Sequence, residues 1–185
     1  MKYDEDGWRW YDNKPSITTI LGNTIANPKL ANWYKKNSAN KIEKVMVTTA
    51  DMGTRAHKAF EEILTGQKPK YDDDIRHIVL SFIEWKEKNN VKPLHVEQNV
   101  TSEKYGFAGI LDFCGYVDGK LVIADWKTSN NYKITNGWQM GAQRLAAMES
   151  LGLNPECGIL GVQISRDKGE VKTFEYQHIR EVEDA

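Results

Sequence analysis

The Asp118-Gly119 pair, set between two long apolar segments, constrains the fold of this chain more than any other feature. Asp-Gly readily supplies the positive φ angles of a tight turn, so the flanking segments are expected to pair as a β-hairpin. The first segment, 105–117, contains three glycines and is better explained as a bent strand than as a helix. The second segment, 121–126, is the return strand. The sequence therefore predicts a sheet at the centre of the fold.

The spacing of apolar residues changes along the chain. In the first half they recur at helical spacing over 49–65, where Gly66 ends the run, and over 75–83, preceded by Asp72–Asp74. In the second half we expect a helix over about 137–151 and strands at 95–100, 105–117, 121–126, 158–165 and 171–176. This order predicts an α/β fold with a mixed central sheet flanked by helices.

Shorter helices are expected upstream of these elements. Ser16 is placed to N-cap a helix that ends at Gly22, and Pro28 suits the first turn of a helix running through Lys36. No repeat, low-complexity tract or Pro/Gly-rich linker interrupts the sequence. We therefore expect one domain over 1–185, made of an N-terminal helical region (1–48), a core (49–178) and a short tail (179–185).

Composition excludes several classes of protein. A chain of 185 residues can bury one core, and no apolar run approaches the roughly 20 residues that cross a bilayer. The first ten residues are acidic and aromatic, without the apolar segment of a secretory signal, so a cytoplasmic protein with no membrane partner is expected. Cys114 and Cys157 lack C-x-x-C spacing and are expected to be buried thiols rather than metal ligands.

Two carboxylates and a lysine are expected to converge at one end of the hairpin. Asp112 lies about six residues before the turn and Asp125 about six after it, so the two residues lie near each other across the ladder. Lys127 follows Asp125 by two residues, and strand alternation points both side chains to the same face. A surface ion pair would also explain an Asp-x-Lys triplet. However, the apolar run 121–124 leads directly into Asp125, and a carboxylate at the end of a buried strand is costly unless something pairs it.

This trio suits the hydrolysis of phosphodiesters. Carboxylate oxygens are hard ligands for Mg²⁺ or Mn²⁺, and such an ion polarises a phosphoryl oxygen. Lys127, as an ammonium, can orient the attacking water or stabilise the charge that develops at phosphorus. With a pKa lowered by its surroundings it can instead act as the base. Both roles for the lysine stay open at this point.

At these residues the sequence resembles the PD-(D/E)-x-K nuclease superfamily, specifically its RecB-like branch. The pattern of that branch is G-x-hydrophobic-D, then hydrophobic-(D/E)-hydrophobic-K-(T/S), and it matches residues 109–112 and 123–128. Segment 15–21 is similar to the start of RecB-like exonucleases of phages and of mitochondrial genome maintenance. The resemblance implies a restriction-endonuclease-like αβββαβ core and a Mg²⁺- or Mn²⁺-dependent deoxyribonuclease.

The resemblance also implies the ligands of the ion. Residues 53–61 are similar to the upstream G-x-x-x-H helix of the branch, which implies that His57 is a metal ligand. Asp112, Asp125 and the backbone carbonyl of Trp126 would complete the set, with the Trp126 side chain in the core. An imidazole ligand is more natural for Mn²⁺ than for Mg²⁺. Two cysteines cannot hold the iron–sulfur cluster that some relatives carry.

A further motif of the branch, Q-x-x-A-Y, falls after the lysine strand. Gln139 matches its first residue, which implies a part in catalysis. Gln143 stands where the branch has tyrosine. A DNA contact is predicted for Gln143 only from this position in the motif. Glu97 lies in the strand before the trio, and from that place we expect it to act as an outer metal ligand.

A basic stretch with aromatic residues in it is expected to bind DNA. Residues 29–58 contain seven basic and two acidic residues. Lysines follow a nucleic-acid backbone, and aromatic rings stack on bases. The alternative is that Trp33 packs in the core and the lysines form a solvated helix face. The expected DNA-binding residues are Trp33, Tyr34, Lys35, Lys36, Arg55 and Gln143, with Lys41 and Lys44 on the same stretch.

The function expected from these features is that of a metal-dependent DNA exonuclease acting on single-stranded or frayed DNA ends. By analogy with the family, it would serve DNA replication, recombination or repair, with phage or host recombination proteins as partners besides DNA. A structure-specific endonuclease shares the chemistry and differs in its substrate. A non-catalytic DNA-binding module is the other alternative, although a decayed site would normally have lost one residue of the trio.

Overall fold

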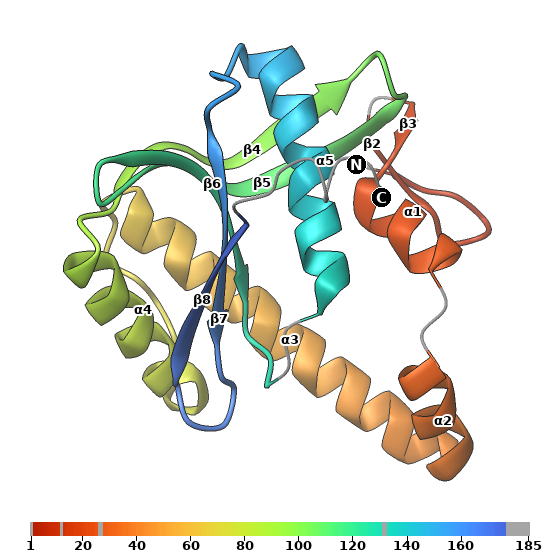
Figure 1. Cartoon of the computed structure of the whole chain (residues 1–185). Helices are drawn as coiled ribbons and strands as arrows, with labels where there is room; N and C mark the ends of the chain where they lie inside the picture. Colours follow the sequence, from red (N-terminus) through yellow and green to blue (C-terminus); the bar gives the residue numbers. More distant parts are fainter. Residues whose placement is uncertain (1, 12, 26–27, 131–132, 177–185) are drawn as a thin grey trace.

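A mixed five-stranded sheet forms the centre of the molecule (Figure 1), whose computed structural model describes residues 2–11, 13–25, 28–130 and 133–176. Its strands lie in chain order: β4 (Lys92–Ser102), β5 (Phe107–Val117), β6 (Lys120–Lys127), β7 (Gly158–Ile164) and β8 (Val171–Tyr176). Neighbouring strands are antiparallel except β6 and β7, which are parallel and are connected through helix α5 (Ile134–Leu151). The α/β class with a mixed sheet, expected from the sequence, is confirmed.

Helices cover the sheet on both faces. Helices α3 (Ala39–Leu64) and α4 (Arg76–Lys88), with the 3₁₀ turn η1 (Asp73–Ile75) between them, share one core with the sheet. Helices α1 (Ile17–Thr24) and α5 share the other. Strand β6 shows the division, because Val122, Ala124 and Trp126 belong to the first core and Ile123 to the second. Strand alternation therefore places Asp125 and Lys127 on the face opposite Trp126.

The hairpin between β5 and β6 has the expected turn. Asp118 has φ 48° and Gly119 has φ 78°, the left-handed values that a tight two-residue turn requires. Gly115, on the outgoing strand, allows a close approach of β4. A Cβ atom at this position would lie 2.3 Å from the carbonyl oxygen of Lys92. The hairpin was predictable from local sequence, whereas this contact depends on a neighbour that only the folded sheet supplies.

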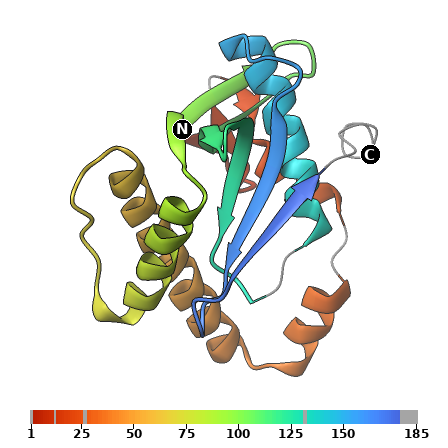
Figure 2. The same cartoon turned by 60° about the vertical axis from the view of Figure 1, so that its left-hand side comes forward.

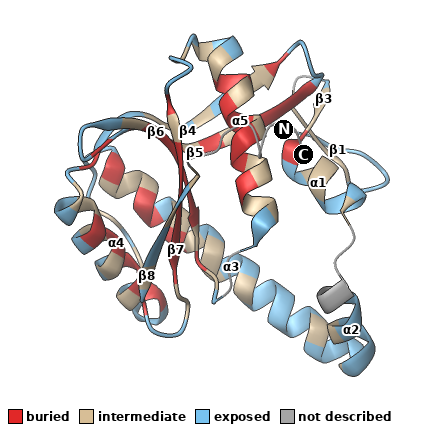
Figure 3. Cartoon of the chain, viewed as in Figure 1, coloured by how far each residue is buried: buried red, intermediate tan, exposed pale blue. Residues whose placement is uncertain are grey.

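Helix α3 begins earlier than the expected start at residue 49. It runs from Ala39, with Ser38 at its N-cap, and its 26 residues span about 39 Å. Its first half and helix α2 (Pro28–Lys36) extend away from the sheet in both views (Figure 1, Figure 2). Most residues there are exposed, including Val45, Met46 and Val47 (Figure 3). This half lacks the buried stripe that periodicity detects, which is why the sequence pattern missed it.

The first part of the expected N-terminal helical region is instead a small antiparallel sheet. Its strands are β1 (Lys2–Tyr3), β2 (Arg9–Tyr11) and β3 (Lys14–Pro15). Strands this short carry too few residues for a period to be recognised. Ser16 forms a parallel bridge with Ala108 on β5, so this sheet is attached to the central one. Helix α1 then continues past Gly22 to Thr24, and residues 179–185 lie outside the described residues.

The two cysteines are buried thiols, as expected. Cys114 lies on β5, while Cys157 directly precedes β7, and neither is in a disulfide. A hydrogen bond between the two thiols raises the pKa of Cys114 and lowers the pKa of Cys157. Both residues belong to the core that α1 and α5 cover. Among the described helices, none is both long enough and apolar enough to cross a bilayer.

Candidate metal centre

Three neighbouring strands place three carboxylates in one row. The β4–β5 ladder pairs Val96 with Phe113 and Gln98 with Leu111, which sets Glu97 opposite Asp112. The β5–β6 ladder pairs Phe113 with Ala124, and the next step of the same register sets Asp112 opposite Asp125. Residues that face each other across antiparallel strands project to the same side of a sheet. The expected proximity of Asp112 and Asp125 follows from this register, and Glu97 extends the row.

The ladder between β5 and β6 opens at the row. Its last pair is Phe113 with Ala124, and beyond it the backbone N–H of Trp126 donates to Oδ2 of Asp112 at 2.9 Å. A carboxylate thus replaces a backbone acceptor there, which fixes the position of Asp112. In an extended strand the N–H and C=O of one residue point to the same side, so the Trp126 carbonyl also faces Asp112.

Glu97 has an unusual backbone conformation. Its φ of 49° lies in the left-handed region, which a non-glycine residue adopts at a cost of about 1–3 kcal/mol. Burial, followed by the nearby charge of Asp112, raises the pKa of its carboxyl to about 7. Strained residues and perturbed carboxyl groups gather at functional sites more often than elsewhere.

Asp125 and Lys127 form a buried ion pair. The Asp125 side chain is 2% exposed, and the Lys127 ammonium lies 2.8 Å from its Oδ1 and 2.7 Å from its Oδ2. Burial raises the pKa of Asp125, although the lysine opposes the rise. Burial alone would lower the pKa of Lys127, but the charges of Asp125 and Asp112 and the hydrogen bond to Asp125 raise it. Lys127 is therefore an ammonium in this state, which favours orientation or charge stabilisation over the role of base.

Helix α3 brings His57 to the row of carboxylates. Its Nδ1 lies 3.6 Å from Oδ2 of Asp112. One ligand atom each from His57, Glu97 and Asp112 lie within 4.8 Å of one another. The helix passes close to the end of β6. A Cβ atom on Gly53 would lie 3.4 Å from Oγ1 of Thr128, the residue that follows this strand. The expected position of His57 beside Asp112 is thus found in the structure.

The residues present fit a divalent cation. Oδ2 of Asp125 is buried and, besides its ion-pair contact with Lys127, accepts no hydrogen bond of good geometry among the described residues. The carboxylate oxygens suit both Mg²⁺ and Mn²⁺ as ligands. The imidazole nitrogen suits Mn²⁺ better than Mg²⁺. The residues that could hold the ion are His57, Glu97, Asp112 and Asp125, with the Trp126 carbonyl.

An open cleft of about 760 Å³ leads to this centre. One wall is the middle of α3, which contributes residues from Thr49 to Glu61. Glu97 and Lys127 come from the sheet, and Arg9 and Thr18 from the N-terminal strands and α1. Sequence reasoning missed Arg9, since no motif covers the short strand β2, and it gave no role to Thr18 within the segment 15–21. The only available signal was a basic residue among three aromatic ones.

The expected DNA-binding residues fall into two groups. Lys35, Lys36 and Tyr34 are exposed on α2, and Trp33 is half-buried there, with its ring edge-on to Tyr34 at 5.6 Å. Trp33 is therefore not part of either core, and Lys41 and Lys44 are exposed on the first half of α3. Arg55 differs from these residues. Its guanidinium contacts the carboxylates of Asp51, Asp72 and Asp74 at 2.6–3.1 Å, so its charge is compensated within the chain.

The two glutamines of α5 lie in different surroundings. Gln143 is 3% exposed and donates from Nε2 to the carbonyl oxygen of Ile110 at 2.6 Å. This contact fastens α5 to β5 two residues before Asp112. Gln139 is half-buried, one helical turn before Gln143. A part for Gln139 in catalysis and a DNA contact for Gln143 remain predictions.

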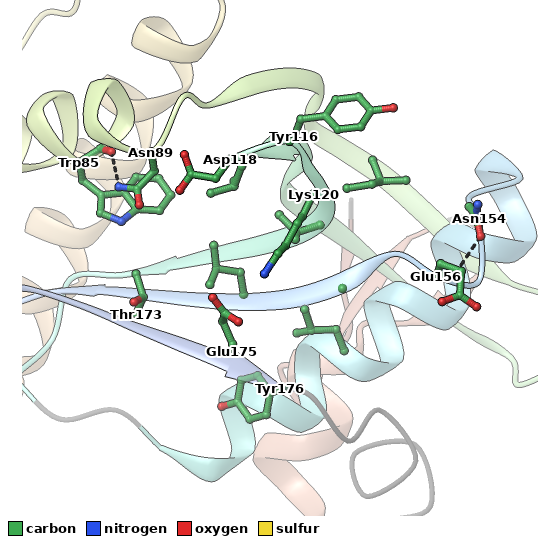
Figure 4. A pocket seen from close by; sticks show the side chains of 17 residues that line it. Trp85, Asn89, Tyr116, Asp118, Lys120, Asn154, Glu156, Thr173, Glu175 and Tyr176 are labelled. Atoms are coloured by element: carbon green, nitrogen blue, oxygen red, sulfur yellow. Dashed lines mark hydrogen bonds between the residues drawn. The ribbon is translucent and has the colours of Figure 1, made fainter.

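A second hollow, of about 730 Å³, lies elsewhere on the sheet and shares no lining residue with the cleft. It is bordered by the β5–β6 turn, the start of β7 and the end of β8. Figure 4 shows the side chains of Lys120 and Glu175 extending into it, with Trp85 at one end. No residue of the metal centre borders this hollow, so it adds nothing to the chemistry described above.

Comparison with known proteins finds a distant relative. No protein-family model matches the chain. Mitochondrial genome maintenance exonuclease 1 of Homo sapiens is 28% identical over 64% of this chain. The matched part is 38% of the length of that relative, so this chain corresponds to well under half of it. The chain is thus similar, at a distance, to an exonuclease of genome maintenance.

Proposed function

We propose that this chain is a metal-dependent deoxyribonuclease of the PD-(D/E)-x-K superfamily, in its RecB-like branch, and that it degrades DNA from an end. The observation that carries the proposal is a group of three possible ligands within 4.8 Å of one another, from one helix and two strands, beside the buried ion pair on the next strand. The three ligands are His57, Glu97 and Asp112, and the ion pair is that of Asp125 with Lys127. The distant similarity to an exonuclease supports the same reaction class.

The groups have distinct tasks in the proposed reaction. His57, Asp112, Asp125 and the Trp126 carbonyl would hold a divalent ion, with Glu97 as a further oxygen ligand. When bound, Mg²⁺ or Mn²⁺ supplies a Lewis acid that offsets negative charge on a phosphoryl oxygen. The Lys127 ammonium donates a hydrogen bond at the same place, where it can orient the attacking water or stabilise the charge at phosphorus.

The cleft and the projecting helices suit a strand of DNA as substrate. The cleft is open, and the exposed lysines of α2 and α3 lie on the part of the molecule that extends away from the sheet. Such lysines would attract the phosphate backbone without reading its sequence. We propose single-stranded or frayed ends as the substrate and replication, recombination or repair as the setting. Cytoplasmic residence and phage or host recombination partners remain predictions from the sequence.

The test is cleavage of end-labelled linear single-stranded DNA and of covalently closed circular single-stranded DNA, each with Mg²⁺, Mn²⁺ or EDTA. Lys127→Met and Asp125→Asn should each lower the rate by at least about 100-fold, the usual effect of removing one catalytic group. Lys120→Met, on the same strand, and Asp118→Asn, in the hairpin turn, are matched controls that should leave the rate unchanged.

The outcomes separate the three candidate functions. Metal-dependent loss of the linear strand with an intact circle supports the exonuclease. Cleavage of the circle as well would keep the site and replace the exonuclease by an endonuclease. Tight DNA binding without cleavage under any of the metals would identify a binding module and refute the proposed chemistry.

A further inference from the structure

Strand β2 of the N-terminal sheet presents a cation and a ring on one face. Arg9 and Tyr11 are two residues apart, so strand alternation places them on the same side. The guanidinium carbon of Arg9 lies 5.9 Å from the centre of the Tyr11 ring, within the range of a cation–π contact. Trp8 and Trp10 project to the other side, with their rings 6.4 Å apart. The sheet therefore has two different faces.

The backbone of Arg9 is held in place by α1. Its carbonyl oxygen accepts a hydrogen bond from the backbone N–H of Ser16 at 2.7 Å. Its N–H donates to Oγ1 of Thr19 at 3.3 Å. Ser16 also bridges to Ala108 on β5, the strand that carries Asp112. The short strand thus has a defined position relative to the metal centre.

The Arg9 face borders the cleft that leads to that centre. Arg9 lines the cleft together with His57, Glu97 and Lys127, although it precedes them by 48 or more positions in the chain. Burial raises the pKa of the Tyr11 hydroxyl, the charge of Arg9 opposes the rise, and the charges of Tyr3 and Glu97 add to it. The side of β2 that carries Arg9 is therefore the side that borders the cleft.

The charge of Arg9 is not compensated by an acidic side chain among the described residues. The other basic residues of the cleft are paired, Lys58 with Glu61 at 2.9 Å and Lys127 with Asp125. Within 2–11, 13–25, 28–130 and 133–176, no carboxylate lies within ion-pair distance of Arg9. An arginine with such an uncompensated charge, facing a cleft, is available to an anionic ligand.

We propose that Arg9 is a phosphate-binding residue, which holds a backbone phosphate of the DNA strand at the wall of the cleft formed by the N-terminal sheet. The inference rests on the proposed function and adds to it a contact that no motif assigns. A planar guanidinium binds phosphate oxygens through two parallel hydrogen bonds, which fixes direction as well as distance. The Tyr11 ring beneath it limits the orientations of the guanidinium before the strand arrives.

The experiment measures DNA affinity rather than cleavage. Fluorescence anisotropy of a labelled dT 20-mer, and of a guanine-containing 20-mer, is recorded with the full chain in the Lys127→Met background, with Ca²⁺ present, between 50 and 400 mM salt. One lost phosphate contact on a single strand lowers the slope of log K against log salt by about 0.7, which corresponds to about fivefold weaker binding at 0.1 M salt. We expect this loss for Arg9→Gln and retention of the parent slope for Arg9→Lys. Arg76→Gln, an exposed arginine of α4 away from the cleft, is the matched control and should bind as the parent does.

Where the parent binds DNA, the inference is overturned by any of three results with the Arg9 variants. Arg9→Gln could bind with the parent slope, which would show that no phosphate contact was lost. Arg9→Gln and Arg9→Lys could lose affinity equally, together with a lower melting temperature, which would show a structural role. The loss could also appear only with a guanine-containing strand, which would show a contact to bases. If the parent itself binds no DNA, the proposed function fails and Arg9 fails with it. If the wild-type chain binds DNA but does not cleave it, the proposed chemistry fails while the Arg9 test still decides the phosphate contact.

Discussion

Replacing Lys127 by methionine should destabilise the metal-free protein by about 3 kcal/mol. The carboxylate of Asp125 is 2% exposed, and the ammonium of Lys127 contacts both of its oxygens at 2.7–2.8 Å. Removing one partner of a buried ion pair typically costs about 3–5 kcal/mol, because the other charge stays buried without compensation. The lower end applies here, since the Lys127 side chain is 26% exposed and water can approach the pair from that side.

The assay is thermal unfolding in EDTA, where no ion can take the place of the lysine. For a chain of this size, about 3 kcal/mol corresponds to a fall in Tm of roughly 6–12 °C. The deficit should also depend on pH. Burial already raises the pKa of Asp125 above its ordinary value, and loss of the lysine raises it further. The folded state then holds a proton that the unfolded state has released, so stability falls as pH rises and the deficit is larger at pH 8 than at pH 6.

Two further variants complete this prediction. Lys120→Met removes an exposed lysine from the other end of β6 and should change Tm by no more than about 1 °C. The double variant Asp125→Asn with Lys127→Met removes both charges, and it should be more stable than Lys127→Met alone. A double variant as unstable as the single one, with a deficit independent of pH, would refute the view that an uncompensated carboxylate is the cause.

Three other predictions follow from single contacts. Gly115→Ala should lower the free energy of chemical unfolding by about 1–3 kcal/mol, because its Cβ would lie 2.3 Å from a backbone oxygen of β4. Gly22→Ala, whose Cβ would meet no atom within 4 Å, should not destabilise the protein, and equal effects of the two variants would contradict the prediction. Between pH 4.5 and 7 the folded wild type keeps the Glu97 proton while the unfolded chain releases it, so stability falls as pH rises. Glu97→Gln in EDTA should remove this fall, and an unchanged pH profile of stability would show that Glu97 does not cause it. Gln143→Ala should cost about 0.5–1.5 kcal/mol by removing the hydrogen bond that the buried Gln143 donates to the half-buried Ile110 carbonyl, with DNA affinity unchanged; weaker DNA binding at full stability would instead support the contact implied by its motif position.

Local sequence was sufficient for the central part of the site. The Asp118-Gly119 turn sets the register of the hairpin, and counting outward from it puts Asp112 and Asp125 at facing positions. The spacing of two residues between Asp125 and Lys127 then determines that both lie on one face. These inferences need only the turn type and the alternation of a strand, which are properties of short segments. The ion pair of Asp125 with Lys127 follows from the same geometry.

The surroundings of the site depend on contacts between distant segments. Glu97 adopts a left-handed φ where it joins the row of carboxylates. Nothing in the neighbouring sequence predicts this conformation. Arg9 reaches the cleft only because Ser16 and Thr19 hold β2 against α1. Arg55 was expected to bind DNA from its place in a basic stretch, yet three carboxylates surround it in the fold. In each case the residue that determines the contact is distant in the sequence, so neither a periodicity nor a motif includes it.

The division between buried strands and exposed helices fits the two demands of the proposed reaction. Groups that hold an ion must keep their positions, and the strands that carry Asp112 and Asp125 are packed by helices on both faces of the sheet. Groups that admit a flexible strand of DNA must be reachable, and the first half of α3 meets this need because it adds no residue to either core. His57 lies further along the same helix, where Ala56 and Phe60 are buried. One continuous helix therefore joins a rigid ligand position to an exposed approach for the substrate, so a proline within its first half should weaken DNA binding while metal binding at His57 is retained.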